Sequence, residues 1–203
     1  MPSPHRPPAL GRRRALAALG ALASPAGLAA LASPAALAGC GDDGPAPNEP
    51  GAPAPQWSLV DFQPQSEGFG QSYGLDRFRG KVLLVTLYAG WCNTCVGHAL
   101  KMAEVEKQLA AEGLDLRVVS INAETADSTV DQQRLIDVAH YPLFQDTPAV
   151  RAWETLRGTR GDLFVYGPDG VLRAYYPVPG PVQVDPYVPE GLANLRQALF
   201  DAR

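Results

Sequence analysis

Beyond Gln56, two kinds of segment alternate along the chain. Short β-rich runs of hydrophobic residues are followed by longer stretches in which hydrophobic residues recur at helical spacing among polar ones. The short runs lack helical periodicity and end at turn residues, which predicts strands, whereas the longer stretches repeat apolar residues every three or four positions. The expected strands are residues 57–62, 81–89, 115–122, 162–166 and 171–176. The expected helices are residues 93–111, 129–140, 148–156 and a C-terminal helix carrying Leu192, Leu195 and Leu199.

The order of these segments predicts an α/β fold, with a mixed β-sheet flanked by helices. Strands that are separated by helices pair in parallel, while the turn at 167–170 makes the last two strands an antiparallel hairpin. The uninterrupted apolar runs at 81–89 and 115–122 are expected to be buried on both faces. The helix at 93–111 is expected to end at Gly113. Its expected buried face carries Val96, Leu100, Ala103 and Leu109.

The first 56 residues differ in composition from the rest of the chain. Residues 1–39 contain four arginines and no acidic residue, and a long alanine- and leucine-rich stretch follows three of these arginines. A basic flank before an apolar run is typical of an export signal. Residues 41–56 contain no aliphatic side chain larger than alanine, and their prolines favour an extended tether. We therefore expect a signal peptide over 1–39, a tether over 40–56 and a globular domain over 57–203.

The charge and the cysteine count exclude two classes of protein. The chain has 17 basic and 21 acidic side chains, and without residues 1–39 the balance is 13 to 21. A nucleic-acid-binding protein would show a basic patch or stripe, so no nucleic-acid partner is expected. Three cysteines are too few for a scaffold that is held together by disulfides.

The apolar run ends in Leu37-Ala38-Gly39-Cys40, which resembles the lipobox of bacterial lipoproteins. The resemblance implies that the signal is cleaved before Cys40 and that the Cys40 thiol is lipidated. The prolines and glycines within the run make it a poor membrane span. We therefore expect an extracytoplasmic protein on the periplasmic side, held at the inner or outer membrane by the lipid on Cys40.

Cys92 and Cys95 stand between a predicted buried strand and a predicted helix. Two intervening residues at a helix start allow the two sulfurs to form a disulfide. Cys92 would accept unpaired backbone N–H groups at the positive end of the helix dipole, which lowers the pKa of its thiol and favours the nucleophilic thiolate. Cys95 lies one turn inside the helix, so it is expected to be more buried and to act as the resolving thiol.

Other uses of this cysteine pair fit the sequence less well. A zinc site needs about four ligands, and no second cysteine pair exists. Haem attachment needs a histidine directly after the second cysteine, where Val96 stands. A structural disulfide across so short a loop would constrain the unfolded chain little. No metal or other cofactor is expected, and a copper carrier using Cys92, Cys95 and His98 remains as a minor alternative.

The strand at 81–89, the motif Trp91-Cys92-Asn93-Thr94-Cys95 and the following helix resemble thioredoxin-fold proteins, which carry Trp-Cys-x-x-Cys. Further segments resemble the amino-terminal domain of selenoprotein P. These segments are Trp57-Ser58, YPLFQ at 141–145, GTRGDLFVY at 158–166 and GVL at 170–172. In that family the first redox position is selenocysteine, and it falls on Cys92. The resemblance covers about residues 57–200 and implies a thioredoxin-like fold with thiol redox activity, including activity towards peroxides.

Two positions depart from the thioredoxin pattern. Thioredoxins have a cis-proline just before the penultimate expected strand, and Gly161 stands in its place here. Thioredoxins also have a buried acid six residues before the first cysteine, where this chain has Thr86. The deprotonation of Cys95 would then depend on Glu104, Glu106 or water.

These observations together predict a monomeric, lipid-anchored thiol–disulfide oxidoreductase that acts on protein or small-molecule thiols and disulfides. The selenoprotein P resemblance makes a thiol peroxidase the alternative. Trp91 is expected either to shield the dithiol and offer an apolar contact surface or to belong to the core. Asn93 and Thr94 are expected to cap the helix and to tune the reduction potential of the pair.

Overall fold

The computed structural model describes residues 44–203 of the chain. The expected signal peptide and the lipidated Cys40 lie outside the described residues. The strands are β1 (Leu59–Val60), β2 (Ser72–Tyr73), β3 (Val82–Tyr88), β4 (Leu116–Asn122), β5 (Leu143–Gln145), β6 (Leu163–Tyr166) and β7 (Leu172–Tyr176). The helices are α1 (Asn93–Ala111), α2 (Thr129–Ile136), α3 (Ala152–Thr155) and α4 (Pro189–Asp201), with 3-10 helices η1 (Leu75–Phe78) and η2 (Glu124–Ala126). Within residues 44–203, no helix is both long and apolar enough to cross a membrane.

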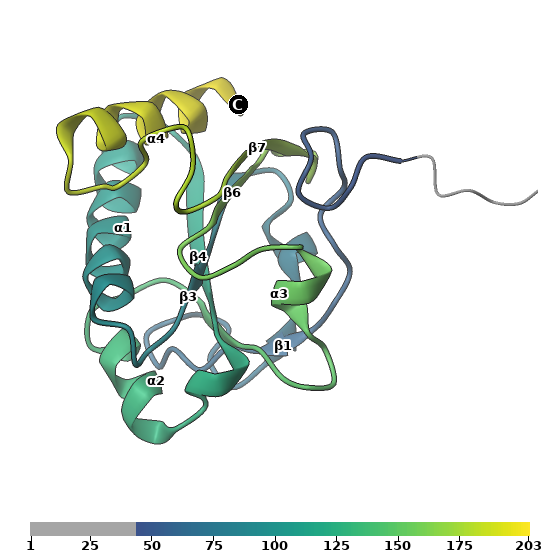
Figure 1. Ribbon diagram of the computed structural model, residues 1–203, viewed down its shortest axis with the longest axis vertical. Coiled ribbons are helices and arrows are strands. Elements are labelled where there is room, and N and C mark those ends of the chain that lie inside the picture. Colours follow the sequence, from purple (N-terminus) through teal and green to yellow (C-terminus); the bar gives the residue numbers. More distant parts are fainter. Residues whose placement is uncertain (1–43) are drawn as a thin grey trace, which may run out of the picture. The chain divides into compact units, whose positions relative to one another are not determined.

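Five strands form one mixed sheet in the order β5-β4-β3-β6-β7 (Figure 1). β4 pairs in parallel with both β3 and β5, whereas β6 pairs antiparallel with both β3 and β7. The mixed sheet and the C-terminal hairpin that the sequence predicts are therefore confirmed. β1 and β2 form a separate antiparallel pair.

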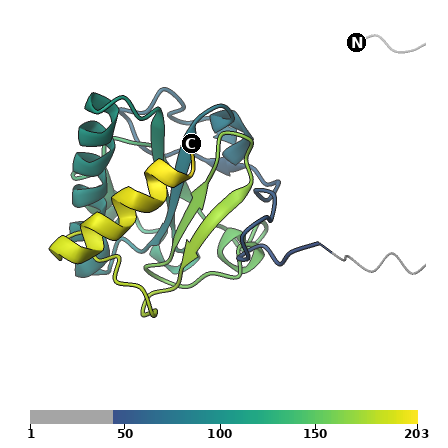
Figure 2. The same cartoon turned by 90° about the horizontal axis from the view of Figure 1, so that it is seen from above.

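The central strand β3 separates two hydrophobic cores. Every residue of β3 is buried, as predicted for a strand covered on both faces. Because successive side chains of a strand point to opposite faces, Leu84 and Tyr88 pack under α1 and α4, whereas Leu83 and Val85 pack against α3 and the N-terminal segment. Figures 1 and 2 show this arrangement, with α1 and α4 together on one side of the sheet and α3 on the other.

Helix α1 begins and ends where the sequence predicts; of its expected core residues, Leu109 is buried, and Val96 and Ala103 are partly buried against the core. Leu100, which was expected in the core, is 43% exposed. The buried positions follow the spacing of a single helix face. They are Cys95, Ala99, Met102, Val105 and Leu109. Two of the other predicted helices are shorter than expected, because α2 ends at Ile136 and α3 covers only Ala152–Thr155.

The chain before Trp57 belongs to the folded domain rather than to a free tether. Gly51 donates its N–H to the carbonyl oxygen of Leu172 at 2.8 Å, and Leu172 donates back to Ala52 at 2.8 Å. The Ala52 side chain is buried. The expected domain boundary at Trp57 is therefore too late, because backbone pairing along the outer edge of β7 requires no large side chain.

The opposite edge of the sheet is covered by residues that follow β1. Phe62 donates its N–H to the carbonyl oxygen of Leu143 in β5 at 2.8 Å. Asp61 is completely buried, and its carboxylate accepts the N–H of Leu143 at 3.2 Å and the Tyr73 hydroxyl at 2.5 Å. The N-terminal part of the domain thus contacts both outer strands of the sheet.

Candidate functional site

The candidate site lies at the turn between β3 and α1. Cys92 donates its N–H to the carbonyl oxygen of Ala89 at 2.9 Å, and Gly90 donates its N–H to the Asn122 side chain at 3.0 Å. A Cβ at Gly90 would lie 2.1 Å from the carbonyl oxygen of Asp131, so the close approach of α2 requires glycine. Both β4 and α2 therefore fix the position of the turn.

Cys92 caps helix α1, and Cys95 lies one turn inside it. The Cys92 sulfur accepts the backbone N–H of Cys95 at 3.2 Å. Cys92 is partly exposed and Cys95 is 4% exposed, and both are free thiols in this structure. The cap expected on Asn93 and Thr94 is wrong, because these residues form the first turn of α1 and the Cys92 sulfur takes the capping position.

The Cys95 thiol is shielded enough to hold its proton strongly. Burial and the hydrogen bond with Cys92 raise the pKa of the Cys95 thiol from 9.0 to about 12, although the nearby Arg160 guanidinium lowers it in part. The buried Cys95 thiol therefore stays protonated at neutral pH.

The reduced protein is expected to lose stability as the pH rises from about 9 towards 12, because in this window the unfolded chain releases the Cys95 proton while the folded chain keeps it. Below pH 9 both states hold the proton, and this contribution does not change. In the disulfide form Cys95 does not titrate, so the loss should be smaller. Urea unfolding of both redox forms between pH 8 and pH 11 measures the difference, and equal slopes would contradict the prediction.

Neither glutamate expected to assist Cys95 is close to it. Glu106 accepts the N–H of Val118 at 2.9 Å and lies 11 residues beyond Cys95, about 16 Å along the helix axis. Glu104 pairs with Lys101 at 2.6 Å on the surface. This geometry excludes both glutamates as the base for Cys95, so water is the remaining one of the three expected candidates.

Thr86 stands at the position of the thioredoxin acid and is part of a buried hydroxyl chain. Its Oγ1 lies 2.6 Å from the Ser120 hydroxyl. Ser120 donates to the Tyr141 hydroxyl at 3.1 Å, and Tyr141 donates to the carbonyl oxygen of Ala99 at 3.2 Å. These neutral groups satisfy one another beneath α1, so the position has a structural role.

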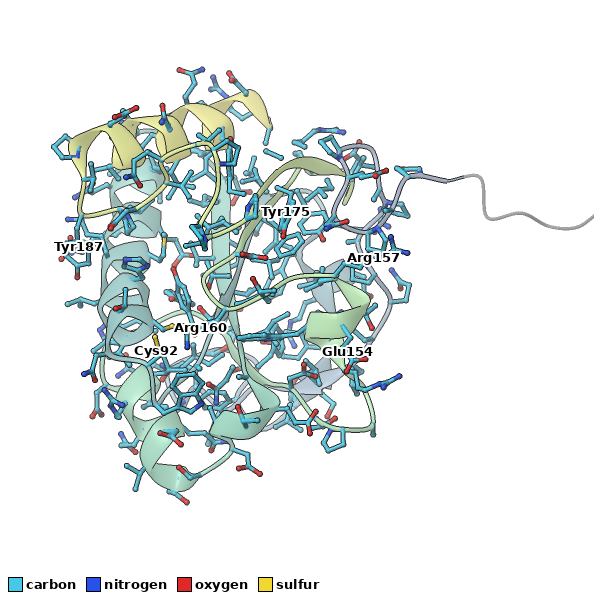
Figure 3. The ribbon with its side chains drawn as sticks, viewed as in Figure 1. Cys92, Glu154, Arg157, Arg160, Tyr175 and Tyr187 are labelled. Carbon is cyan, nitrogen blue, oxygen red and sulfur yellow. The ribbon has the colours of Figure 1, made fainter. Side chains whose placement is uncertain are left out.

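The loop before β6 brings Arg160 to the dithiol (Figure 3). The guanidinium carbon of Arg160 lies 5.2 Å from the centroid of the Trp91 ring. Trp91 is 44% exposed, which excludes the alternative of a core tryptophan. Gly161 has a φ of 97° and donates its N–H to Leu87 at 2.7 Å, which holds the loop against the end of β3.

A cavity of about 440 Å³ extends from Thr94 and Gly161 along α1 to the loop 177–186. His98 lines this cavity, and its Nε2 lies 3.4 Å from the Asp185 carboxylate. Burial lowers the pKa of His98, and the Asp185 carboxylate opposes that shift. Over the described range 44–203, no group of three or more His, Cys, Asp or Glu side chains is placed to hold a metal ion, so the copper set is not brought together here.

Two arginines near the site were not among the expected functional residues. Arg160 enters from the loop before β6, and Arg134 of α2 donates a hydrogen bond to the side chain of Asn93. Both are far from Cys92 along the chain. No local motif marks either one, and only the three-dimensional fold brings them to the start of α1.

Comparison with known proteins supports the resemblances noted in the sequence. Residues 50–175 match the model of the AhpC/TSA family. Selenoprotein Pb of Danio rerio is 25% identical over 140 residues, which cover 67% of this chain and 49% of that protein. The chain therefore spans about half the length of this relative. The expected likeness to selenoprotein P is confirmed.

Solved structures share the fold at low sequence identity. A secreted disulfide oxidoreductase of Mycobacterium tuberculosis is 15% identical with a TM-score of 0.51, over 72% of this chain and 96% of that one. The thioredoxin domain of a thiol-disulfide oxidoreductase from Bacteroides vulgatus is 17% identical with a TM-score of 0.51, over 63% and 87%. These likenesses confirm the thioredoxin-like fold. The chain belongs to the AhpC/TSA family, whose members are redox enzymes.

Proposed function

We propose that the chain is a thiol–disulfide oxidoreductase in which Cys92 is the nucleophile and Cys95 the resolving thiol. The observation that carries this proposal is the Cys92 sulfur, which is partly exposed at the N-terminus of α1 and accepts the N–H of Cys95. A helix N-terminus favours a negatively charged sulfur. Membership of a family of redox enzymes supports the same chemistry.

In the reducing direction, the Cys92 thiolate attacks one sulfur of a substrate disulfide. A bond forms between the two sulfurs, the substrate S–S bond breaks, and its second sulfur leaves as a thiolate that takes a proton from water. Cys95 then gives up its proton and attacks Cys92, which releases the second substrate thiol. The protein loses two electrons as the Cys92–Cys95 disulfide forms, and the substrate gains them.

Equilibration of the full chain with glutathione or dithiothreitol buffers at neutral pH tests this proposal. A reversible two-electron couple assigned to Cys92 and Cys95 is expected. A potential near about −270 mV would indicate a reductant, and one near about −120 mV an oxidant. Thiols that stay reduced or oxidise irreversibly would contradict the assignment.

A thiol peroxidase is the second candidate, and the match to selenoprotein Pb favours it. In this reaction the Cys92 thiolate attacks one peroxide oxygen, the O–O bond breaks, the second oxygen leaves as hydroxide that takes a proton from water, and a sulfenic acid forms on Cys92. The Cys95 thiol then attacks the sulfenic sulfur, which forms the Cys92–Cys95 disulfide and releases water. Stopped-flow mixing with hydrogen peroxide separates the two candidates. A rate constant for peroxide no larger than that of free cysteine would exclude the peroxidase, and thiol–disulfide exchange would remain as the proposed function.

We also propose that the protein works outside the cytoplasm and is attached to a membrane by a lipid on Cys40. The lipobox-like Leu37-Ala38-Gly39-Cys40 and the preceding basic and apolar segments support this location. Among the structural neighbours, the Mycobacterium tuberculosis oxidoreductase is described as secreted. Anchoring after export would keep the dithiol outside the cytoplasm, where disulfides persist.

A further inference from the structure

We infer that the dithiol site selects thiols and disulfides that carry carboxylates beside the reacting sulfur, and that Arg160 and Arg134 bind those carboxylates. This inference rests on the proposed function and specifies its substrate class. It depends on Arg160 beside the dithiol, on Arg134 at the neighbouring Asn93 side chain, and on the acidic character of the rest of the domain.

Arg160 presents a free cation on one side of the dithiol. Its side chain is exposed and lies over Trp91, and its charge also acts on Cys95. The nearest acid in sequence, Asp162, is buried and accepts the N–H of Val178 at 2.8 Å, so it does not pair with Arg160. Figure 3 shows Arg160 close to Cys92.

Arg134 presents a second cation on the side of α2. Its guanidinium donates to the Asn93 side chain, one residue after Cys92. The acid one turn earlier in α2, Asp131, is used at the helix start, where its carboxylate accepts the Ser128 hydroxyl at 2.7 Å. The ion pairs found within residues 44–203 include neither Arg134 nor Arg160.

The remainder of the domain would repel anionic substrates. Residues 44–203 carry 13 basic and 19 acidic side chains, so the net charge of the domain is negative and disfavours the approach of anions. Arg160 beside the dithiol and Arg134 at the adjacent Asn93 side chain, both without acidic partners among the described residues, add positive charge at the start of α1. A substrate with carboxylates is therefore attracted to the site and disfavoured elsewhere, which orients it for attack by Cys92.

The guanidinium group suits this role chemically. It offers several N–H donors in a planar fork that matches a carboxylate, and it can stack on an aromatic ring while its edge stays free to donate. Trp91 thus gives Arg160 a support that leaves its donors available. The electron and proton transfers of disulfide exchange are unchanged; the arginines act on the approach and orientation of the substrate.

The test compares three disulfides of different charge on the reduced full chain: oxidised glutathione, bis(2-hydroxyethyl) disulfide and cystamine. We expect Arg160→Gln and Arg134→Gln each to lower the rate constant for oxidised glutathione about threefold to tenfold, and to leave that for cystamine unchanged or raised. If the potential favours the reverse direction, the oxidised protein is mixed with glutathione and cysteamine, because both directions pass through the same mixed disulfides.

Arg157→Gln is the matched control, since it removes the same charge three residues before Arg160, at a position that Figure 3 shows away from Cys92. This variant should leave all rate ratios unchanged. The inference would be overturned if the ratio of the rate constant for oxidised glutathione to that for cystamine were equal in the native protein, Arg160→Gln and Arg157→Gln. Failure of the proposed function looks different, because no disulfide of any charge would then react.

A second pair of probes identifies the source of the carboxylates. Disulfide-bridged peptides flanked by glutamates or by lysines report on protein segments, whereas oxidised glutathione reports on small molecules. An arginine-dependent preference for the glutamate peptide alone indicates an acidic protein partner. A preference seen with glutathione alone indicates a small-molecule thiol, and a preference in neither pair overturns the inference.

Discussion

Replacement of Cys92 by serine is expected to lower the rate of thiol–disulfide exchange by at least about a thousandfold, because the hydroxyl group cannot act as the sulfur nucleophile. The fold should be retained. Serine is a favoured helix cap, so its hydroxyl can accept the Cys95 N–H that the Cys92 sulfur accepts. Rates of reaction with a small disulfide, measured beside thermal unfolding of both proteins, check this prediction.

Cys95→Ser is the matched variant for the second step. It keeps the accessible Cys92 thiol and removes the buried thiol that would release the substrate, so a mixed disulfide should accumulate on Cys92. Peptide mapping by mass spectrometry locates this adduct and separates it from any adduct on Cys40. A Cys92→Ser variant that reacts as fast as the native protein would refute the assignment of the nucleophile.

Replacement of Asp162 by alanine is expected to reduce the free energy of unfolding by about 2–4 kcal/mol. The buried carboxylate accepts the N–H of Thr159 at 2.7 Å, the N–H of Val178 at 2.8 Å and the Tyr175 hydroxyl at 2.7 Å. Alanine would remove the shared acceptor of all three donors, which lie in partly buried surroundings. Urea unfolding followed by circular dichroism measures the change.

Two variants calibrate that result. Asp162→Asn keeps the size and one acceptor oxygen, so its loss should be smaller than that of the alanine variant. Asp127→Ala removes an exposed acid and should change stability by no more than about 0.5 kcal/mol. An alanine variant of Asp162 as stable as the Asp127 variant would show that the buried carboxylate contributes nothing net.

The sequence alone predicts the parts of the fold that depend on long regular patterns. Strands β3 and β4 are uninterrupted apolar runs, and α1 extends from the cysteine motif to the glycine after its last turn. β2 and β5 have two and three residues, and distant partners define them, so no local periodicity marks them. Segment 51–54 escapes prediction because alanine and proline suggest a tether, although backbone pairing holds it in place.

The candidate site likewise has one part that the sequence predicts and one part that it does not. Cys92 and Cys95 form a local motif at a strand–helix junction, and the structure places them there with the expected difference in exposure. Arg134 and Arg160 come from elements that are distant in sequence, and their approach depends on how α2 and the loop before β6 pack. Which charged side chains approach a thiol depends on how the elements pack in the folded protein, so residue spacing along the chain does not predict it.

The coverage of both sheet edges by the N-terminal part of the domain bears on self-association. An uncovered outer strand exposes a row of N–H and C=O groups that can add a strand from another molecule. Here the segment at 51–54 occupies the edge of β7, and residues 61–62 occupy the edge of β5. A protein crowded against its own copies would thus be protected from intermolecular strand pairing, and a version shortened to begin at Trp57 would lose that protection on the β7 side.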